Sequence, residues 1–244
     1  MAPVFSALLI KKLQSIGTLS KEDEQELRNL SGASRELAPG EAVVHEGDQP
    51  NSTTLVQSGV LCRYKHVAEG KRQIMSFHIA GDIPDLQSLF MQSMDHSLGA
   101  VVRSHVVLIR HEVVRNLLKR CPGIGFLFWR DTLIDASVFR EWMTSIGRRD
   151  AQSRIAHLFC EMVTRMRAVG LADTHHCDLP ITQLDVADAL GLTDIHVCRV
   201  LKNLREQNIV EFRHGVITVL DWEGLQEAGE FDPAYLHLKT ERVA

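Results

Sequence analysis

Two amphipathic patterns lie back to back near the C-terminal end of the chain, one on each side of Gly191. Thr182 is placed as the N-cap of the first pattern and Thr193 as the N-cap of the second. Gly191 permits the positive φ of a tight turn between them. The pattern predicts a helix-turn-helix, although an antiparallel helix pair in any helical domain would share it. The apolar positions at helical spacing are Leu184, Val186, Ala187 and Leu190, followed by Val197, Val200, Leu201 and Leu204.

The segment after this helix pair predicts a β-hairpin. Residues 209–212 and 216–220 are rich in β-branched and aromatic side chains, and His214-Gly215 separates them as a turn. A helix-turn-helix followed by a hairpin is the winged-helix arrangement, which binds DNA. The second helix would leave its polar face outward for that purpose, formed by Asp194, His196, Arg199, Lys202 and Asn203.

Between residues 34 and 110 the pattern changes to short β-rich runs separated by turn signals. Runs of about five residues at intervals of about ten indicate an antiparallel sandwich or barrel. The runs cover residues 42–45, 52–56, 60–64, 72–77, 100–102 and 106–109, and the turns contain Gly40, Gly47, Gly59, Gly70 and Gly81. A helical lead-in up to about residue 29 precedes them.

A long helix is predicted from Pro122 to about Arg148, and it is apolar on two sides. Such a helix needs two partners, of which one is its own domain and the other is the same helix of a second copy. A core helix in a monomer is the alternative. One stripe holds Phe126, Trp129, Leu133, Ala136 and Met143, and the other holds Leu127, Ile134, Val138, Trp142 and Ile146.

Composition limits these interpretations. The chain has 244 residues, 45% of them hydrophobic and 24% charged, which suits a globular protein of two modest domains. We divide it into residues 1–120, a connecting helix at 121–149, and residues 150–244. No apolar run spans a bilayer and no signal peptide is visible, so we expect a cytoplasmic protein without a membrane partner. The net charge of -4 means that DNA binding depends on a local patch.

The glycine pattern resembles a known family. Pro39-Gly40-Glu41, Glu46-Gly47-Asp48, Ser58-Gly59 and Gly81-Asp82 resemble the jelly-roll of cyclic-nucleotide-binding domains. Together with the winged helix, nearly the whole chain is similar to the CRP/FNR family of bacterial transcription regulators. This implies an α+β fold with an N-terminal jelly-roll, a long dimerisation helix and a C-terminal winged helix-turn-helix. It also implies a homodimer on palindromic double-stranded DNA that contacts RNA polymerase.

The resemblance assigns roles to the second helix of the motif. Arg199 matches the arginine that the family directs at a guanine, and Ile195 replaces a glutamate common to the cAMP-dependent and FNR-type members. His196 offers a further base contact. The run from Thr193 to Arg199 is similar to that of FixK-like members. Phosphate contacts are expected from Thr182, Thr193 and Lys202, and Cys198 is either an inert small residue or a redox switch beside DNA.

The effector pocket implied by the resemblance departs from the cAMP pattern. Leu86, after Asp85, stands where cAMP-binding relatives carry a ribose-binding carboxylate, and His96-Ser97 replaces the arginine-containing phosphate pair. A buried phosphate without its guanidinium loses about 1.5–3 kcal/mol. We therefore expect control by something other than cAMP. A regulator that needs another small-molecule effector is the alternative, and a barrel that only docks proteins is a third possibility.

Cofactor and enzyme chemistry find little support. The five cysteines are scattered, and none precedes Cys62, unlike the N-terminal cluster of iron–sulfur regulators. His175, His176 and Cys177 lack metal-site spacing. Haem ligation by His66, His78 or His96 is an alternative, but a lone histidine is more often structural or exposed, so no metal or other cofactor is expected. The chain has no phosphate-binding loop, nucleophile elbow or zinc-protease motif. We expect a regulator and no enzyme.

Overall fold

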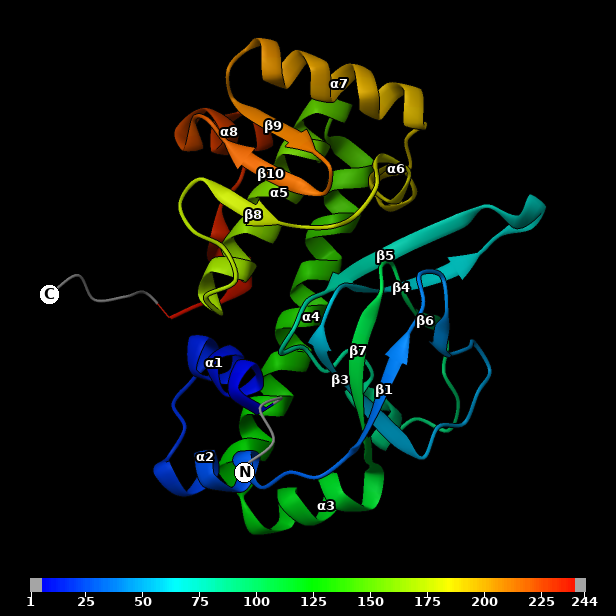
Figure 1. The fold of residues 1–244 in the computed structure, drawn as a ribbon, viewed down its shortest axis with the longest axis vertical. Helices are drawn as coiled ribbons and strands as arrows, with labels where there is room; N and C mark the ends of the chain where they lie inside the picture. Colours follow the sequence, from blue (N-terminus) through cyan, green and yellow to red (C-terminus); the bar gives the residue numbers. More distant parts are fainter. Residues whose placement is uncertain (1–5, 240–244) are drawn as a thin grey trace, which may run out of the picture. The chain divides into compact units, whose positions relative to one another are not determined.

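The computed structural model describes residues 6–239, which divide into two compact units. Within the described residues, the first unit contains residues 6–64, Phe77–Ala136 and residues 237–239. The second unit contains Lys65–Ser76 and Ser137–Leu236. Figure 1 shows helices and sheets in both units, and the predicted fold class is confirmed.

Two antiparallel sheets form the jelly-roll. Their strand orders are β1-β7-β3 and β2-β6-β4-β5, with the last strand continuing into the second unit. Leu37, Val56 and Val106 of the first sheet pack with Leu61 and Leu98 of the second in one buried cluster. The strands are β1 (Ala33–Leu37), β2 (Ala42–Val44), β3 (Ser52–Ser58), β4 (Leu61–His66), β5 (Arg72–His78), β6 (Ser97–Ala100) and β7 (Ser104–Arg110).

Glycines at the turns allow the chain to reverse between the strands of the jelly-roll. All of the glycines that marked turns in the sequence have positive φ, including 85° at Gly59 and 100° at Gly81. A Cβ at Gly59 would lie 2.8 Å from the carbonyl oxygen of Arg103, and one at Gly81 would lie 2.8 Å from that of Leu8. Both positions therefore require glycine for its backbone freedom and for its lack of a side chain.

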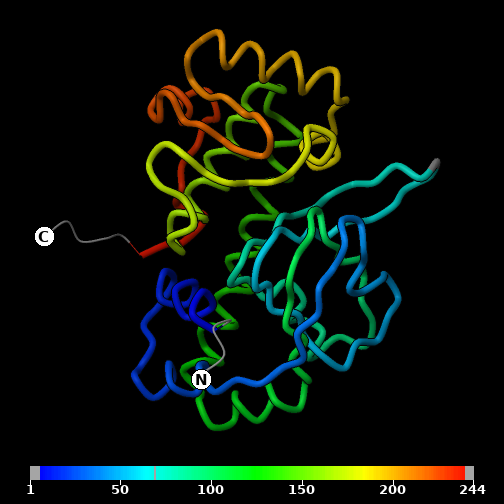
Figure 2. The backbone as a smooth tube through the Cα atoms, in the orientation of Figure 1, coloured from blue at the N-terminus to red at the C-terminus, as the bar shows by residue number. Residues whose placement is uncertain are grey.

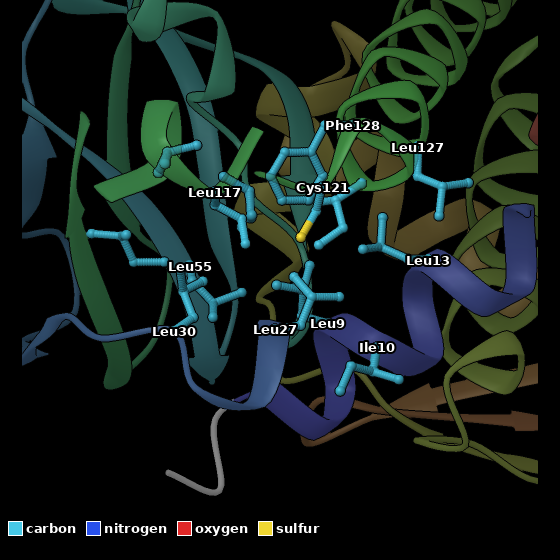
Figure 3. Packing of buried hydrophobic residues seen from close by; sticks show 14 of the residues in the cluster. Leu9, Ile10, Leu13, Leu27, Leu30, Leu55, Leu117, Cys121, Leu127 and Phe128 are labelled. Carbon is cyan, nitrogen blue, oxygen red and sulfur yellow. The ribbon is translucent and has the colours of Figure 1, made fainter. Parts of the chain in front are cut away.

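Helices cover the jelly-roll through a second buried cluster. Leu9, Ile10 and Leu13 of α1 belong to one cluster with Leu127 and Phe128 of α4 (Figure 3), which also contains side chains of β3, β7, α2 and α3. The helices of this unit are α1 (Ser6–Ile16), α2 (Lys21–Arg28), α3 (His111–Arg120) and the first half of α4 (Pro122–Arg148), with the short 3₁₀ turn η2 (Leu86–Leu89). The 3₁₀ turn η1 (Ala68–Gly70) belongs to the second unit.

The second unit is built on α5. Helices α6, α7 and α8 pack against it, and Phe159 of α5 contacts Phe212 of the wing with ring centroids 5.1 Å apart. The course of the backbone can be followed in Figure 2. Its elements are α5 (Ala151–Ala168), β8 (His176–Asp178), α6 (Gln183–Leu190), α7 (Asp194–Glu206), β9 (Val210–Arg213), β10 (Val216–Val219), α8 (Trp222–Gly229) and the 3₁₀ turn η3 (Pro233–Leu236).

A buried carboxylate ties these elements together. Glu161 of α5 is fully buried and accepts hydrogen bonds from the Trp142 indole at 3.0 Å and the Tyr235 hydroxyl at 2.9 Å. Arg165, one turn later, donates to its other oxygen at 3.1 Å. A buried charge is tolerated only when it is paired and hydrogen-bonded in this way. The network joins the end of α4, α5 and η3 within the unit that carries the helix-turn-helix.

Several elements differ from the sequence-based expectation. The strand predicted at residues 100–102 lies at Ser97–Ala100, because β6 pairs in register with β4 from Leu61 to Tyr64, and the following valines form a bend. The strand β1 and the helix α3 were not anticipated. The segment 170–180, predicted as a polar connector, contains β8, which adds a third strand to the wing in the order β8-β10-β9.

Candidate DNA-binding surface

The first helix of the predicted helix-turn-helix, α6, begins at a capping box. The Thr182 hydroxyl accepts the Asp185 N–H at 3.1 Å, and the Asp185 carboxylate accepts the Thr182 N–H at 2.9 Å. This reciprocal pair satisfies two of the backbone donors that every helix start leaves open. The predicted N-cap at Thr182 is therefore confirmed, and it fixes where α6 begins.

One predicted core position of α6 is wrong. Leu184 is 57% exposed, whereas Val186, Ala187 and Leu190 are buried as expected. The inward position of the first turn belongs to Asp185, whose carboxylate is used by the capping box. Leu184 consequently points to solvent beside the start of the helix.

The second helix, α7, has the expected cap and faces. Gly191 ends α6 with φ 64°, and Thr193 caps α7 by accepting the His196 N–H at 3.2 Å. Val197, Val200, Leu201 and Leu204 are buried, and α7 packs on α5 and β9 through this face. The packing fixes the rotation of α7 about its axis, so the opposite face is held toward solvent.

Every side chain predicted to contact a base lies on that exposed face. Ile195 is 68% exposed, and His196 and Arg199 are exposed as well. Within residues 6–239 Arg199 has no ion-pair partner closer than 4 Å, while the neighbouring Lys202 lies 3.7 Å from Glu206. Arg199 is therefore available for a ligand, and Lys202 is only weakly held, because exposed pairs one turn apart contribute a few tenths of a kcal/mol.

The wing forms a groove with the start of α6. The turn residues His214 and Gly215 both have positive φ, 52° and 77°, which is typical of the tight hairpin turn that matches strand twist. An open cavity of about 570 Å³ lies between this turn and α6. It is lined by residues 180–183 and 212–215, which include Thr182, Arg213 and His214. A groove of this kind fits a phosphate backbone because free N–H groups at a helix start attract anions.

Cys198 differs from the other cysteines. It is exposed on α7, whereas Cys62, Cys121, Cys160 and Cys177 are buried, and all of them are free thiols. Burial raises the pKa of the Cys177 thiol to about 12, and it raises the pKa of Cys160 as well. Those thiols are inert because only the thiolate reacts, so Cys198 is the cysteine that solution oxidants reach most easily.

The residues predicted for a degenerate effector pocket are largely engaged within the jelly-roll. Asp85 is completely buried and accepts hydrogen bonds from the hydroxyls of Thr53 at 2.6 Å and Thr54 at 2.7 Å. Burial raises its pKa, and these hydrogen bonds oppose that rise. Leu86 begins η2 and packs against the apolar cluster of α1 and α4. Neither side chain is positioned to bind a ribose.

His96 and Ser97, expected at the phosphate position, lie near Arg63, which was not among the predicted pocket residues. The His96 ring bonds to Asp95 at 2.7 Å, while Ser97 accepts the Glu46 N–H at 3.0 Å. Arg63 of β4 is buried and pairs with Asp135 of α4 and with the Pro84 carbonyl. Burial lowers the His96 pKa, and the nearby Arg63 charge adds to the effect. The alternation of β4 contained a signal, since Arg63 shares the inward face with Leu61.

One apolar stripe of α4 is buried within the chain, and the other is exposed. Leu127, Ile134, Val138 and Trp142 are buried within the chain. The other stripe remains open: Phe126 is 64% exposed, Trp129 63%, Leu133 50% and Met143 73%. Large apolar side chains in a row on a solvent-facing helix mark an interaction surface.

No metal or membrane site emerges from the described part of the chain. Asp173, a candidate with His175 and His176, accepts both of their backbone N–H groups at 2.7 Å and so shapes a turn. Residues 6–239 hold no group of three side chains placed to bind a metal ion. Across the same residues, no helix is long and apolar enough to cross a bilayer.

Each unit contains a segment that matches a known protein family. Residues 153–228 match the Crp-like helix-turn-helix domain, and residues 34–121 match the cyclic nucleotide-binding domain. The chain belongs to the CRP/FNR family of transcription regulators. Helices α6 and α7 both lie within the matched helix-turn-helix domain.

Individual CRP/FNR proteins support this placement. The chain is 29% identical to the nitrogen fixation regulation protein FixK of Bradyrhizobium diazoefficiens, over 86% of this chain and 88% of FixK. It is 26% identical to the transcriptional activator protein FnrL of Cereibacter sphaeroides, over 85% and 86%. The structure of FixK2 from Bradyrhizobium japonicum superposes with a TM-score of 0.73 at 25% identity, over 82% of this chain and 98% of that one. The resemblance to FixK-like members is thereby confirmed.

Proposed function

We propose that this CRP/FNR regulator binds a palindromic DNA site as a homodimer and does so without cAMP. The observation that carries the proposal is the exposed polar face of α7, which is held outward by buried apolar packing and a capped N-terminus. Each protomer would place α7 in the major groove of one half-site, with the half-sites about one helical turn apart.

Sequence would be recognised by Ile195, His196 and Arg199. Arg199 suits bidentate binding to the O6 and N7 atoms of guanine, which discriminates against other bases by about 1–3 kcal/mol. Ile195 offers an apolar surface to a thymine methyl group, and His196 supplies a hydrogen bond. The exposure of all three side chains supports these roles.

Phosphates would be held by Thr193, Lys202 and the start of α6. Thr193 uses its hydroxyl oxygen as an acceptor for the cap, so its proton remains available for a phosphate. The Thr182 hydroxyl instead donates to Asp185 at 2.6 Å, so its side chain contributes mainly by fixing the helix start. Arg213 and His214 of the wing extend this contact line along the groove described above.

The homodimer would form through the exposed stripe of α4. Phe126, Trp129 and Leu133 are apolar, exposed and spaced at helical intervals, so a two-fold copy of the same helix would cover them. A CRP/FNR dimer would also explain how one recognition helix per chain is matched to a palindrome.

Control by cAMP is disfavoured by the side chains inside the jelly-roll. The charge of the Arg63 guanidinium acts on His96, but Asp135 already pairs with it, and Leu86 offers no carboxylate to a ribose. The FixK-like relationship supports the same conclusion.

A second candidate is a regulator that requires an effector other than cAMP. The observation in its favour is the Nε2 atom of His96, which is buried and has no hydrogen-bond partner among the described residues. A buried polar atom of this kind is unusual in a folded protein, and a small molecule with a hydrogen-bonding group would satisfy it.

On DNA, the protein would activate transcription through contact with RNA polymerase. It would act in the cytoplasm. FnrL, a relative, is a transcriptional activator protein. The related proteins are regulators, and we assign no catalytic step to this chain.

Selection from random duplex DNA by the purified, reduced protein tests the proposal. We expect enrichment of a palindrome without any added effector. Enrichment only after addition of a cell extract of small molecules would favour the second candidate. Enrichment of a single, non-repeated half-site would contradict the homodimer on a palindrome.

A further inference from the structure

Arg72 of the β4–β5 hairpin forms ion pairs with α6, the first helix of the helix-turn-helix. Residues 65–76, at the tip of this hairpin, belong to the same compact unit as the winged helix. Arg72 donates to Asp185 at 2.6 Å through one terminal nitrogen and to Asp188 at 2.9 Å through Nε. Its side chain is only 26% exposed, so water screens these pairs less than it screens a surface ion pair.

The same Asp185 carboxylate serves the cap of α6. Its Oδ2 atom accepts from the N–H and hydroxyl groups of Thr182, at 2.9 and 2.6 Å, while Oδ1 accepts from Arg72. Both oxygens of this buried carboxylate are therefore used, one by the helix start and one by the hairpin. Movement of Arg72 would release one side of the group that fixes Thr182.

A second contact holds the other end of α6. The Gln73 side-chain amide donates to the Ala189 carbonyl at 3.1 Å. Two consecutive hairpin residues thus contact the first and last turns of α6. This arrangement restricts both rotation and sliding of the helix, because the contacts are spread along its length.

The ion pairs of Arg72 change the electric charge that α6 presents to DNA. Asp185 and Asp188 are acidic groups on the helix whose N-terminal end lines the proposed phosphate groove. Unpaired carboxylates there would repel a phosphate backbone, and the positive charge of Arg72 offsets one of these two negative charges.

We propose that Arg72 is a positioning residue for DNA binding, which pairs with Asp185 and Asp188 and thereby holds the start of α6 in the geometry that faces the DNA backbone. Arg72 itself does not contact DNA in this mechanism. The inference rests on the proposed function for its effect on affinity, whereas its effect on α6 is independent of DNA.

Four variants test the mechanism: Arg72→Ala, Arg72→Lys, Asp188→Asn, and Arg72→Ala combined with Asp188→Asn. Arg103→Ala is the control, since it removes one positive charge from an exposed pair with Glu36. Hydrogen–deuterium exchange of the full-length protein without DNA reports on α6. Fluorescence anisotropy with the selected duplex, at several salt concentrations, reports the Kd and its salt dependence, and thermal melts show that each variant is folded.

We expect Arg72→Ala to increase exchange in residues 183–190 and to raise the Kd by about three- to tenfold. Arg72→Lys should recover part of both effects, because it restores the charge but not the two-point geometry. In the Asp188→Asn background the loss should be smaller, since removal of Arg72 then leaves one unpaired carboxylate on α6 where the parent protein would have two. The slope of log Kd against log salt should fall by clearly less than one, because carboxylate repulsion is screened by salt but no phosphate contact is lost, and Arg103→Ala should behave like the wild type.

Unchanged exchange in α6 after Arg72→Ala would overturn the proposal, and so would an unchanged Kd in the folded variant. A salt slope lowered by about one, with the same loss in the Asp188→Asn background, would show that Arg72 binds phosphate directly and would also overturn it. If the wild type selected no duplex, the proposed function would be wrong together with the affinity part of this inference. The exchange comparison would then still decide whether Arg72 fixes α6.

Discussion

The exposed stripe of α4 makes the proposed dimer testable with Leu133→Glu. Leu133 is 50% exposed in the single chain, so about half of its side chain is left for a partner to cover. Burying a whole leucine contributes about 1.5–3 kcal/mol, so the remaining half contributes about 1 kcal/mol. Two-fold symmetry doubles this to about 2 kcal/mol.

Glutamate at the same position adds a further penalty. A carboxylate in a covered apolar seam loses its hydration, which costs several kcal/mol when no cation is near. A total of at least about 3 kcal/mol raises the dimer dissociation constant by about two orders of magnitude. Because Leu133 faces solvent in the single chain, the monomer should keep its fold.

Sedimentation velocity over a range of concentrations measures this shift, and circular dichroism checks the fold. Phe90→Glu is the matched control, since Phe90 is 81% exposed but lies outside α4. Leu133→Glu should be monomeric at micromolar concentrations and should lose the palindrome, whereas Phe90→Glu should stay dimeric. A Leu133→Glu protein that dimerises as well as the wild type would refute the assignment of this stripe.

Three further predictions concern the DNA and effector sites. Arg199→Ala should lower the preference for one base pair in each half-site by about 1–3 kcal/mol, whereas Lys202→Ala should weaken binding to all sequences and reduce the salt slope by about one; competition anisotropy distinguishes them. Isothermal titration should detect no cAMP binding at micromolar affinity, because Asp135 already pairs with Arg63, and micromolar binding would contradict this. If Cys198 is a redox switch, peroxide should weaken DNA binding of the wild type but not of Cys198→Ser, and equal sensitivity of the two would end that hypothesis.

Local sequence signals were sufficient to predict where the two helices of the helix-turn-helix begin and where the turn between them lies. Thr182 and Thr193 are N-caps, and Gly191 has a positive φ, as their residue types predict. Each of these features depends on the backbone within three or four residues, which is why a single sequence reveals it. The two stripes of α4 were visible for the same reason, although only packing decided which stripe is buried.

Side-chain partners distant in sequence came only from the tertiary structure. Leu184 was predicted to be buried, but Asp185 occupies the inward position of the first turn of α6. There its carboxylate accepts hydrogen bonds from the capping box and from Arg72. Arg72 and Asp185 are 113 residues apart, and Arg63 and Asp135 are 72 apart.

The sequence by itself determined most of the elements, though not β1, β8 or α3, and it determined the caps of the helix-turn-helix, the turn glycines and the outward face of α7. These follow from local backbone preferences and from the period of the apolar side chains. Only the tertiary structure decided which strands pair, which charges neutralise each other and which apolar face stays open. Those outcomes depend on the approach of segments that share no local signal, because packing and desolvation act between neighbours in space whatever their separation along the chain.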